Sequence, residues 1–290
     1  MNEFLVLLSP VQLLLDPLSH EFMRRALMVS ALVGGVCGLL SCYMTLKGWA
    51  LMGDAVSHAV MPGVVVAYAL GFPFSVGAFV FGVGSVALIG FVKQKSRIKE
   101  DTVIGVVFTG FFALGIVLVS KIKSNIDLMH ILFGSPLGIS ENDVSQTLLI
   151  SIIVVSILLI FRRDLMLYCF DATHARSIGI NTGLLHYLLL SLLSLSAVVG
   201  LQTVGIILVV AMLITPGATA YLLTDRFDRM ALLAVLSSVI SSLLGVYISY
   251  WSDIETGGSI VLVQTILFLF AFIFAPKYGI LRSRNLINPH

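Results

Sequence analysis

The feature of this sequence that most restricts its fold is a series of long uncharged apolar stretches separated by clusters of charge. Five stretches contain 18 to 23 residues each, close to the ~20 that an α-helix needs to cross a bilayer. Only 11% of the chain is charged, whereas a soluble domain has about a quarter. The sequence therefore predicts a membrane protein with spans at residues 26–46, 102–120, 144–161, 230–252 and 256–276.

Two further apolar stretches, residues 55–92 and 177–224, are too long for one helix. Turn signals divide them at Gly71-Phe72-Pro73 and near residues 200–202. The sequence thus predicts an all-α, polytopic membrane fold with eight or nine spans, residues 126–141 being either re-entrant or spanning. Barrel strands are excluded because these segments are continuously apolar and do not alternate.

The distribution of Lys and Arg predicts the orientation in the membrane. If the loop at residues 93–99 is cytoplasmic, then 13 of the 17 Lys and Arg residues lie on that side, as the positive-inside rule favours. The N-terminus is then outside and the C-terminus inside. We expect a surface segment at residues 1–21, a transmembrane domain at 22–276 and a cytoplasmic tail at 277–290.

Two ionisable residues stand at the start of the second predicted span. Asp54 and His58 are four residues apart, so on a helix they share one face, where a carboxylate and an imidazole can hold one divalent cation. Ionisable groups within membrane spans often mark a transport path. Two plainer interpretations remain open: Asp54 as a helix cap, and His58 as a hydrogen-bonded interior histidine.

An acidic pair, Glu100 and Asp101, precedes the fourth predicted span. Because the second and fourth spans begin on the same side, we expect this pair at a depth similar to that of Asp54 and His58. Three carboxylates and one imidazole form a mostly oxygen donor set, which suits Mn²⁺ or Fe²⁺ more than copper. The alternative is that the pair simply stabilises a helix N-terminus.

Proline and glycine interrupt two spans, at Pro62-Gly63 and Pro216-Gly217. Such breaks in apolar segments are typical of substrate paths through transporters, because proline leaves the carbonyl four residues earlier without its helical partner. For Pro62 that carbonyl belongs to His58, and for Pro216 to Met212. A kink that only serves helix packing is the alternative at either site.

Four segments together resemble the metal-ion permease family of ABC transporters, and the similarity extends from about residue 32 to about residue 276. They are GDAVSHAVMPGVVVAY (53–68), EDTVIGVVFTGFFALGIVL (100–118), HILFGSPLGIS (130–140) and VGIILVVAMLITPGATAYLLTDRF (204–227). The resemblance implies a type II-like importer permease in the bacterial inner membrane. It also implies that Asp54 and His58 belong to the ion path, and that Glu100 and Asp101 match the family's acidic pair.

The resemblance further implies partners: a second copy of the permease, two ATP-binding subunits and an extracytoplasmic metal-binding protein. Residues 164–180 look like the cytoplasmic segment that couples such permeases to their ATPases. Within it the coupling residues are expected to be Asp171, Ala172, Ala175 and Gly179.

The predicted function is therefore a permease subunit for manganese or iron, and not an enzyme. No phosphate-binding loop of the Gly-x-x-x-x-Gly-Lys-Ser/Thr type occurs, so ATP hydrolysis is assigned to a separate subunit. We expect no permanently bound cofactor, only the transported Mn²⁺, Fe²⁺ or Zn²⁺. A zinc permease of the same family and a proton-coupled secondary transporter or channel remain as alternatives.

Overall fold

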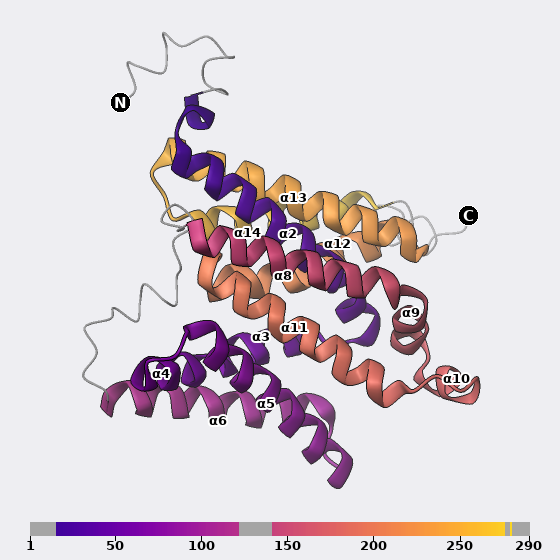
Figure 1. Ribbon diagram of the computed structural model, residues 1–290. Helices are drawn as coiled ribbons and strands as arrows, with labels where there is room; N and C mark the ends of the chain where they lie inside the picture. Colours follow the sequence, from indigo (N-terminus) through magenta and orange to yellow (C-terminus); the bar gives the residue numbers. More distant parts are fainter. Residues whose placement is uncertain (1–15, 122–140, 276–278, 280–290) are drawn as a thin grey trace, which may run out of the picture.

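The computed structural model describes residues 16–121, 141–275 and 279, and in this part of the chain all regular structure is helical (Figure 1). Residues 1–15 of the predicted surface segment, the predicted tail 277–290 apart from residue 279, and the predicted re-entrant or spanning segment 126–141 apart from residue 141 lie outside it. The helices are α2 (Glu21–Lys47), α3 (Ala50–Ala59), α4 (Met61–Leu70), α5 (Phe74–Lys95), α6 (Glu100–Lys121), α8 (Glu141–Ile160), α9 (Arg162–Phe170), α10 (Ala172–Ser177), α11 (Thr182–Val204), α12 (Ile206–Leu223), α13 (Phe227–Ser252) and α14 (Thr256–Phe274).

The predicted spans coincide with these helices, which confirms the all-α membrane fold. In the described ranges, eight helical segments are long and apolar enough to cross a membrane, with α3 and α4 counting together as Leu51–Leu70. The remaining predicted span is α12, whose apolar part, Leu208–Leu223, is shorter. The sequence located the spans because the bilayer requires each of them to be apolar and its thickness sets their length.

Two helices end at a glycine with a positive φ angle, at or near the predicted breaks. Helix α4 ends at Gly71, with φ 72°, and Pro73 precedes α5, which confirms the predicted turn. The division between α11 and α12 lies at Gly205, with φ 88°, so its prediction at residues 200–202 was slightly wrong. A single glycine suffices for this sharp turn because only a residue without Cβ adopts that backbone conformation readily.

Helix α2 is the middle member of a central group with α12 and α13, which pack against it and lie beside it in Figure 1. Small residues allow their backbones to approach closely: a Cβ at Gly38 of α2 would lie 2.9 Å from the carbonyl oxygen of Ala234 in α13. A Cβ at Gly217 of α12 would be closer than 3.0 Å to the carbonyl oxygen of Ser41. The glycines in these segments therefore serve close helix packing.

A second group of helices, α3 to α6, lies beside this centre and towards the lower left in Figure 1. Its members also approach closely at one point, since a Cβ at either Gly63 of α4 or Gly77 of α5 would collide with the other backbone. Gly53 of α3 faces Leu213 of α12, with 3.4 Å between a Cβ placed there and that side chain. The Asp54 segment is thereby held against the central helices.

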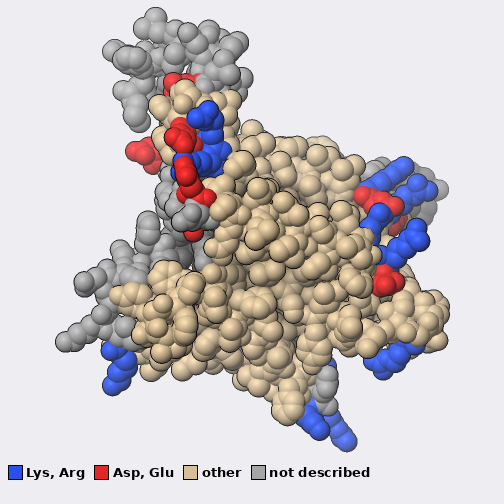
Figure 2. All heavy atoms as spheres, in the orientation of Figure 1, with Lys and Arg blue, Asp and Glu red and all other residues tan. Residues whose placement is uncertain are grey.

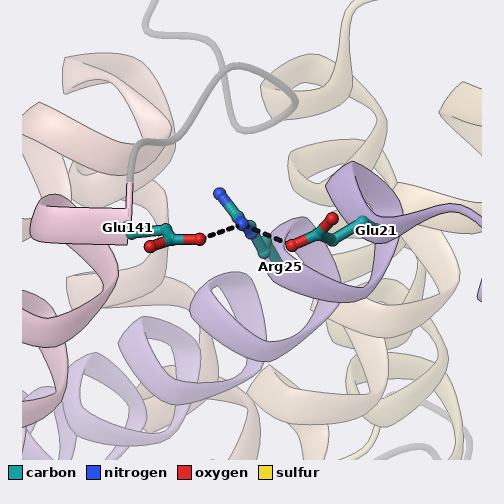
Figure 3. A network of polar contacts seen from close by, with 3 residues as sticks. All are labelled: Glu21, Arg25 and Glu141. Atoms are coloured by element: carbon teal, nitrogen blue, oxygen red, sulfur yellow. Dashed lines mark hydrogen bonds and ion pairs between the residues drawn. The ribbon is translucent and has the colours of Figure 1, made fainter.

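Charged side chains gather at the ends of the helices, and a broad uncharged band separates them (Figure 2). At one end, the guanidinium group of Arg25 in α2 bonds the carboxylates of both Glu21 and Glu141, the latter at 2.6 Å (Figure 3). This contact joins the start of α2 to the start of α8. At the opposite end, Arg162 of α9 forms an ion pair with Asp228 of α13. The uncharged band has the distribution expected of a surface facing lipid.

Candidate functional site

Asp54 lies inside a helix and not at its start. The N-cap of α3 is Trp49, and Asp54 is the fifth helical residue. A carboxylate caps a helix by accepting N–H bonds from the first turn, and Asp54 is past that turn. The alternative in which Asp54 only caps the span is therefore wrong, and another reason is needed for a carboxylate at this depth.

The side chains of Asp54 and His58 do meet. His58 Nε2 lies 3.3 Å from Asp54 Oδ1, and the two side chains are 25% and 38% exposed. Two ligands of one ion in neighbouring octahedral positions, each at about 2.2 Å, would be separated by ~3.1 Å, and tetrahedral ligands by slightly more. The observed distance is that of a direct contact between the carboxylate and the imidazole, and it lies between the two separations that a single divalent cation would set.

Aromatic residues of α6 surround the imidazole of His58. Phe108 and Phe112 contact it edge-on, with ring centroids 5.1 Å and 5.3 Å away. The other nitrogen, His58 Nδ1, is buried without a hydrogen-bond partner among the described residues. The two phenylalanines hold the ring with Nε2 towards Asp54. Sequence reasoning missed them, although their spacing of four residues places both on one helical face.

Pro62 produces only a slight interruption between α3 and α4. Val60, the residue between them, keeps right-handed helical angles, and its N–H still bonds the carbonyl of Val56. At this cap the carbonyl of His58 also accepts a backbone N–H. The expectation that this oxygen is left free was therefore wrong, because the backbone adjusts locally to satisfy it.

Glu100 and Asp101 are the first two residues of α6, and their side chains lie outside the described part of the structure. The backbone nevertheless sets their depth. His58 is level with Phe108 and Phe112, and Pro62 is level with Gly115, so α3 and α6 run in the same direction. Asp54 is four residues before His58, so it is level with about residue 106 of α6. Glu100 and Asp101 come five to six residues earlier, which at 1.5 Å per residue is about 8 Å along the helix axis. The acidic pair is therefore not at the depth of Asp54.

The described side chains do not complete a metal site by themselves. Among them, no group of three or more His, Cys, Asp and Glu residues is placed to hold a metal ion. The Asp54–His58 pair offers two donor atoms, and their role as metal ligands stays a prediction. The convergence of four residues, including Glu100 and Asp101, stays a prediction.

The second Pro-Gly sequence lies within a continuous helix. Pro216 is buried inside α12, which runs through it without a break. Gly217 faces α2, where any side chain would strike the backbone of Ser41. Gly217 thus permits a close helix contact, as in the alternative interpretation of this motif, and a role of Pro216 in lining a path stays a prediction.

The predicted coupling segment contains a short exposed helix, α10, between α9 and α11. Asp171 caps it by accepting N–H bonds from Thr173 and His174, both at 2.9 Å. These bonds, that of His174 first, lower the pKa of Asp171. Ala175 is fully buried and Gly179 has φ 88°. Of the four expected coupling residues, Asp171, Ala175 and Gly179 therefore shape this segment.

Comparison with known proteins places this arrangement in a family. The chain matches the ABC 3 transport family over residues 19–275. It belongs to that family. It is 57% identical to the manganese transport system membrane protein MntB of Synechocystis, covering 100% of this chain and 96% of the relative. It is also 49% identical to the chelated iron transport system membrane protein YfeD of Yersinia pestis, covering 90% and 88%.

A solved structure of PsaBC from Streptococcus pneumoniae in complex with Fab has the same fold as this ABC 3 family member. The TM-score is 0.87 at 39% identity, covering 97% of this chain and 100% of the other. The chain is therefore the membrane-spanning permease subunit of an ABC transporter. Family membership sets aside the alternative of a proton-coupled secondary transporter or channel.

Proposed function

We propose that this chain forms the membrane path of an ATP-driven importer of divalent metal ions, with manganese or iron as the transported ion. The observation that carries the proposal is the Asp54–His58 pair, one helical turn apart within a membrane span, with donor atoms 3.3 Å apart. A partly exposed carboxylate at this position is unfavourable unless it serves a cavity or a ligand. The manganese and iron relatives support the choice of ion.

In this proposal, Asp54 supplies an oxygen and His58 Nε2 a nitrogen to the passing ion. Two protein ligands leave most positions of an octahedral ion to water or to Glu100 and Asp101. Weak, incomplete coordination suits transport, because an ion held by few ligands can leave again. Phe108 and Phe112 keep the imidazole oriented and restrict water on that side.

The remaining parts of the transporter are assigned by the same proposal. The permease acts as a homodimer with two ATP-binding subunits, and an extracytoplasmic metal-binding protein delivers the ion. Helix α10 and Gly179 contact the ATPase, with the exposed side chains of His174 and Ile178 as the contact surface. The N-terminus lies outside and the C-terminus in the cytoplasm.

The test of the site is uptake of ⁵⁴Mn by cells that carry single substitutions. We expect Asp54→Asn and His58→Ala each to reduce uptake at least tenfold, because loss of either ligand removes half of the protein coordination. The matched controls are Asp253→Asn, at an exposed position with φ 53° that asparagine tolerates, and His20→Ala, which is also exposed. Wild-type uptake by a membrane-inserted, assembled His58→Ala variant would show that His58 is only a packed interior residue.

Competition between metals tests the choice of ion. Unlabelled Mn²⁺ and Fe²⁺ should suppress ⁵⁴Mn uptake at lower concentrations than Zn²⁺ does. If Zn²⁺ competes best, and ⁶⁵Zn uptake also depends on Asp54, the zinc alternative replaces the manganese and iron assignment while the site itself stands.

Labelling of single cysteines tests the orientation. Lys95→Cys, at the end of α5, and Ser252→Cys, at the end of α13, are both at exposed positions. A membrane-impermeant maleimide added to intact cells should label only the cysteine at position 252. Labelling of both positions from the same side contradicts the proposed arrangement of spans.

A further inference from the structure

A cavity of about 280 Å³ opens at the end of the bundle where α2 and α5 finish and α11 begins. It is separate from the Asp54–His58 pair, neither of which lines it. Three of its lining residues are cations, Lys47, Lys93 and Arg176, and none of the lining residues with a described side chain is acidic. Aromatic and polar side chains complete the wall: Trp49, Tyr168, Thr182, His186 and Tyr187.

The three cations lack negative partners among the described residues. Lys47 Nζ lies 4.0 Å from the ring centre of Tyr168 and 3.4 Å from its carbonyl oxygen. Lys93 donates to the carbonyl of Ile98 at 3.1 Å, and Arg176 to the hydroxyl of Thr182 at 3.4 Å. Every one of these partners is neutral, so no acidic side chain in the described part of the chain pairs with the three cations that line the cavity. Such a cavity attracts an anion.

The wall of the cavity is held in place by contacts that do not involve a ligand. Tyr168 Oη bonds His186 Nδ1 at 2.9 Å, and Trp49 contacts the His186 ring edge-on at 5.2 Å. Trp49 and Tyr168 are both buried. The part of the wall formed by Trp49 and Tyr168 is therefore already in place, whereas Lys93, Arg176 and Tyr187 are exposed.

Large apolar side chains on α5 and α11, two of the helices that line the cavity, are exposed. Leu88 and Phe91 of α5 are 41% and 60% exposed, and Leu184 and Tyr187 of α11 are 55% and 44% exposed. The helices meet here, since a Cβ at Gly90 would lie 3.6 Å from Tyr187 Oη. A soluble anion would leave this apolar surface unused, whereas a phospholipid would cover it with acyl chains.

We propose that this cavity binds the headgroup phosphate of an anionic phospholipid, with its acyl chains lying along α5 and α11. The cavity stands at the end of the apolar spans, where headgroups lie, and basic pockets between transmembrane helices are suited to such lipids. Because α10 contributes Arg176, the bound lipid also contacts the segment assigned to ATPase coupling. The lipid site does not depend on which metal is transported.

The test is native mass spectrometry of the detergent-purified transporter complex after exposure to phosphatidylglycerol or phosphatidylcholine. We expect retained phosphatidylglycerol on the wild type, and a loss in affinity of about fivefold for Lys93→Gln and a further fivefold for Lys93→Gln with Arg176→Gln. Lys93→Arg should retain the lipid. The matched control, Arg163→Gln with Arg229→Gln, removes two charges near the same end of the bundle and should change retention less than twofold.

Three results would overturn the proposal. Equal losses in the two double variants would mean general surface attraction, and unchanged retention in Lys93→Gln with Arg176→Gln would place the lipid elsewhere. A third arm adds millimolar glycerol phosphate or inorganic phosphate. If these soluble anions bind in a manner that requires Lys93 while phosphatidylglycerol does not, the cavity takes a soluble anion and not a lipid.

Discussion

Helix α2, in the central group, and helix α6, in the neighbouring group, differ in how tightly they are enclosed. Fifteen residues of α2 are buried, among them Gly34 and Gly38, which face Ser238 of α13. Helix α6 instead exposes a large apolar face, with Val106 69% exposed and Val117 57%. Both helices are apolar in sequence, yet 72% of the apolar window of α2 is buried by its own chain, against 22% for α6.

This difference bears on where the proposed metal-binding pair lies. Asp54 and His58 stand on α3, between the enclosed centre and the exposed α6. A buried pair in the centre would have to be desolvated, whereas a pair at the boundary keeps contact with water or ions. The centre holds the position of α3, and the boundary leaves the two side chains accessible.

The strongest test of this contrast is a substitution in the central helices. We expect Gly217→Val to prevent accumulation of the folded permease, because its side chain would collide with the backbone of Ser41. The control is Gly110→Ala on α6, where a Cβ has nothing within 4 Å. Fluorescence-detected size-exclusion chromatography measures both. A monodisperse Gly217→Val variant that accumulates to the wild-type amount would mean that the central helices accommodate an added side chain as easily as α6 does.

A smaller effect is expected at the boundary itself. Replacing Phe108 and Phe112 together by alanine should leave the protein folded but reduce metal uptake roughly tenfold, because His58 loses the two rings that orient it. Uptake of ⁵⁴Mn and the thermal unfolding midpoint are measured in parallel. Replacement of Leu114, exposed on the same helix, by alanine is the control. Equal effects of the two changes would assign the rings to general packing.

The smallest effect is expected outside both groups, at the cap of α10. Asp171→Ala should speed amide hydrogen exchange of residues 173 and 174 several-fold, whereas Asp171→Asn should change it little, since asparagine also caps helices. Because the folded-state pKa of Asp171 is lowered, the cap is fully effective above the ordinary aspartate value of about 3.9. It weakens as the pH falls through the lowered pKa. Unchanged exchange in Asp171→Ala would show that the Asp171 side chain does not stabilise the start of α10.

The sequence by itself determined the spans, the helical class and the pairing of Asp54 with His58. Spans follow from bilayer thickness and apolar composition, and residues four apart on one helix meet without help from the rest of the fold. The turn at Gly71 follows from equally local chemistry. The family resemblance, based on motifs from several spans, was also available from the residues alone and was confirmed by the match over residues 19–275.

Only the tertiary structure decided which neighbours these local features acquire. The register of α6 against α3 brought Phe108 and Phe112 to His58 and set Glu100 and Asp101 farther along the axis. Tertiary packing also placed Gly217 against the backbone of Ser41. It also gathered Lys47, Lys93 and Arg176, from three distant segments, around one cavity. The apolar residues of a membrane helix face either lipid or other helices. Because lipid chains and helix surfaces are similarly apolar, the sequence pattern does not specify which helix packs on which.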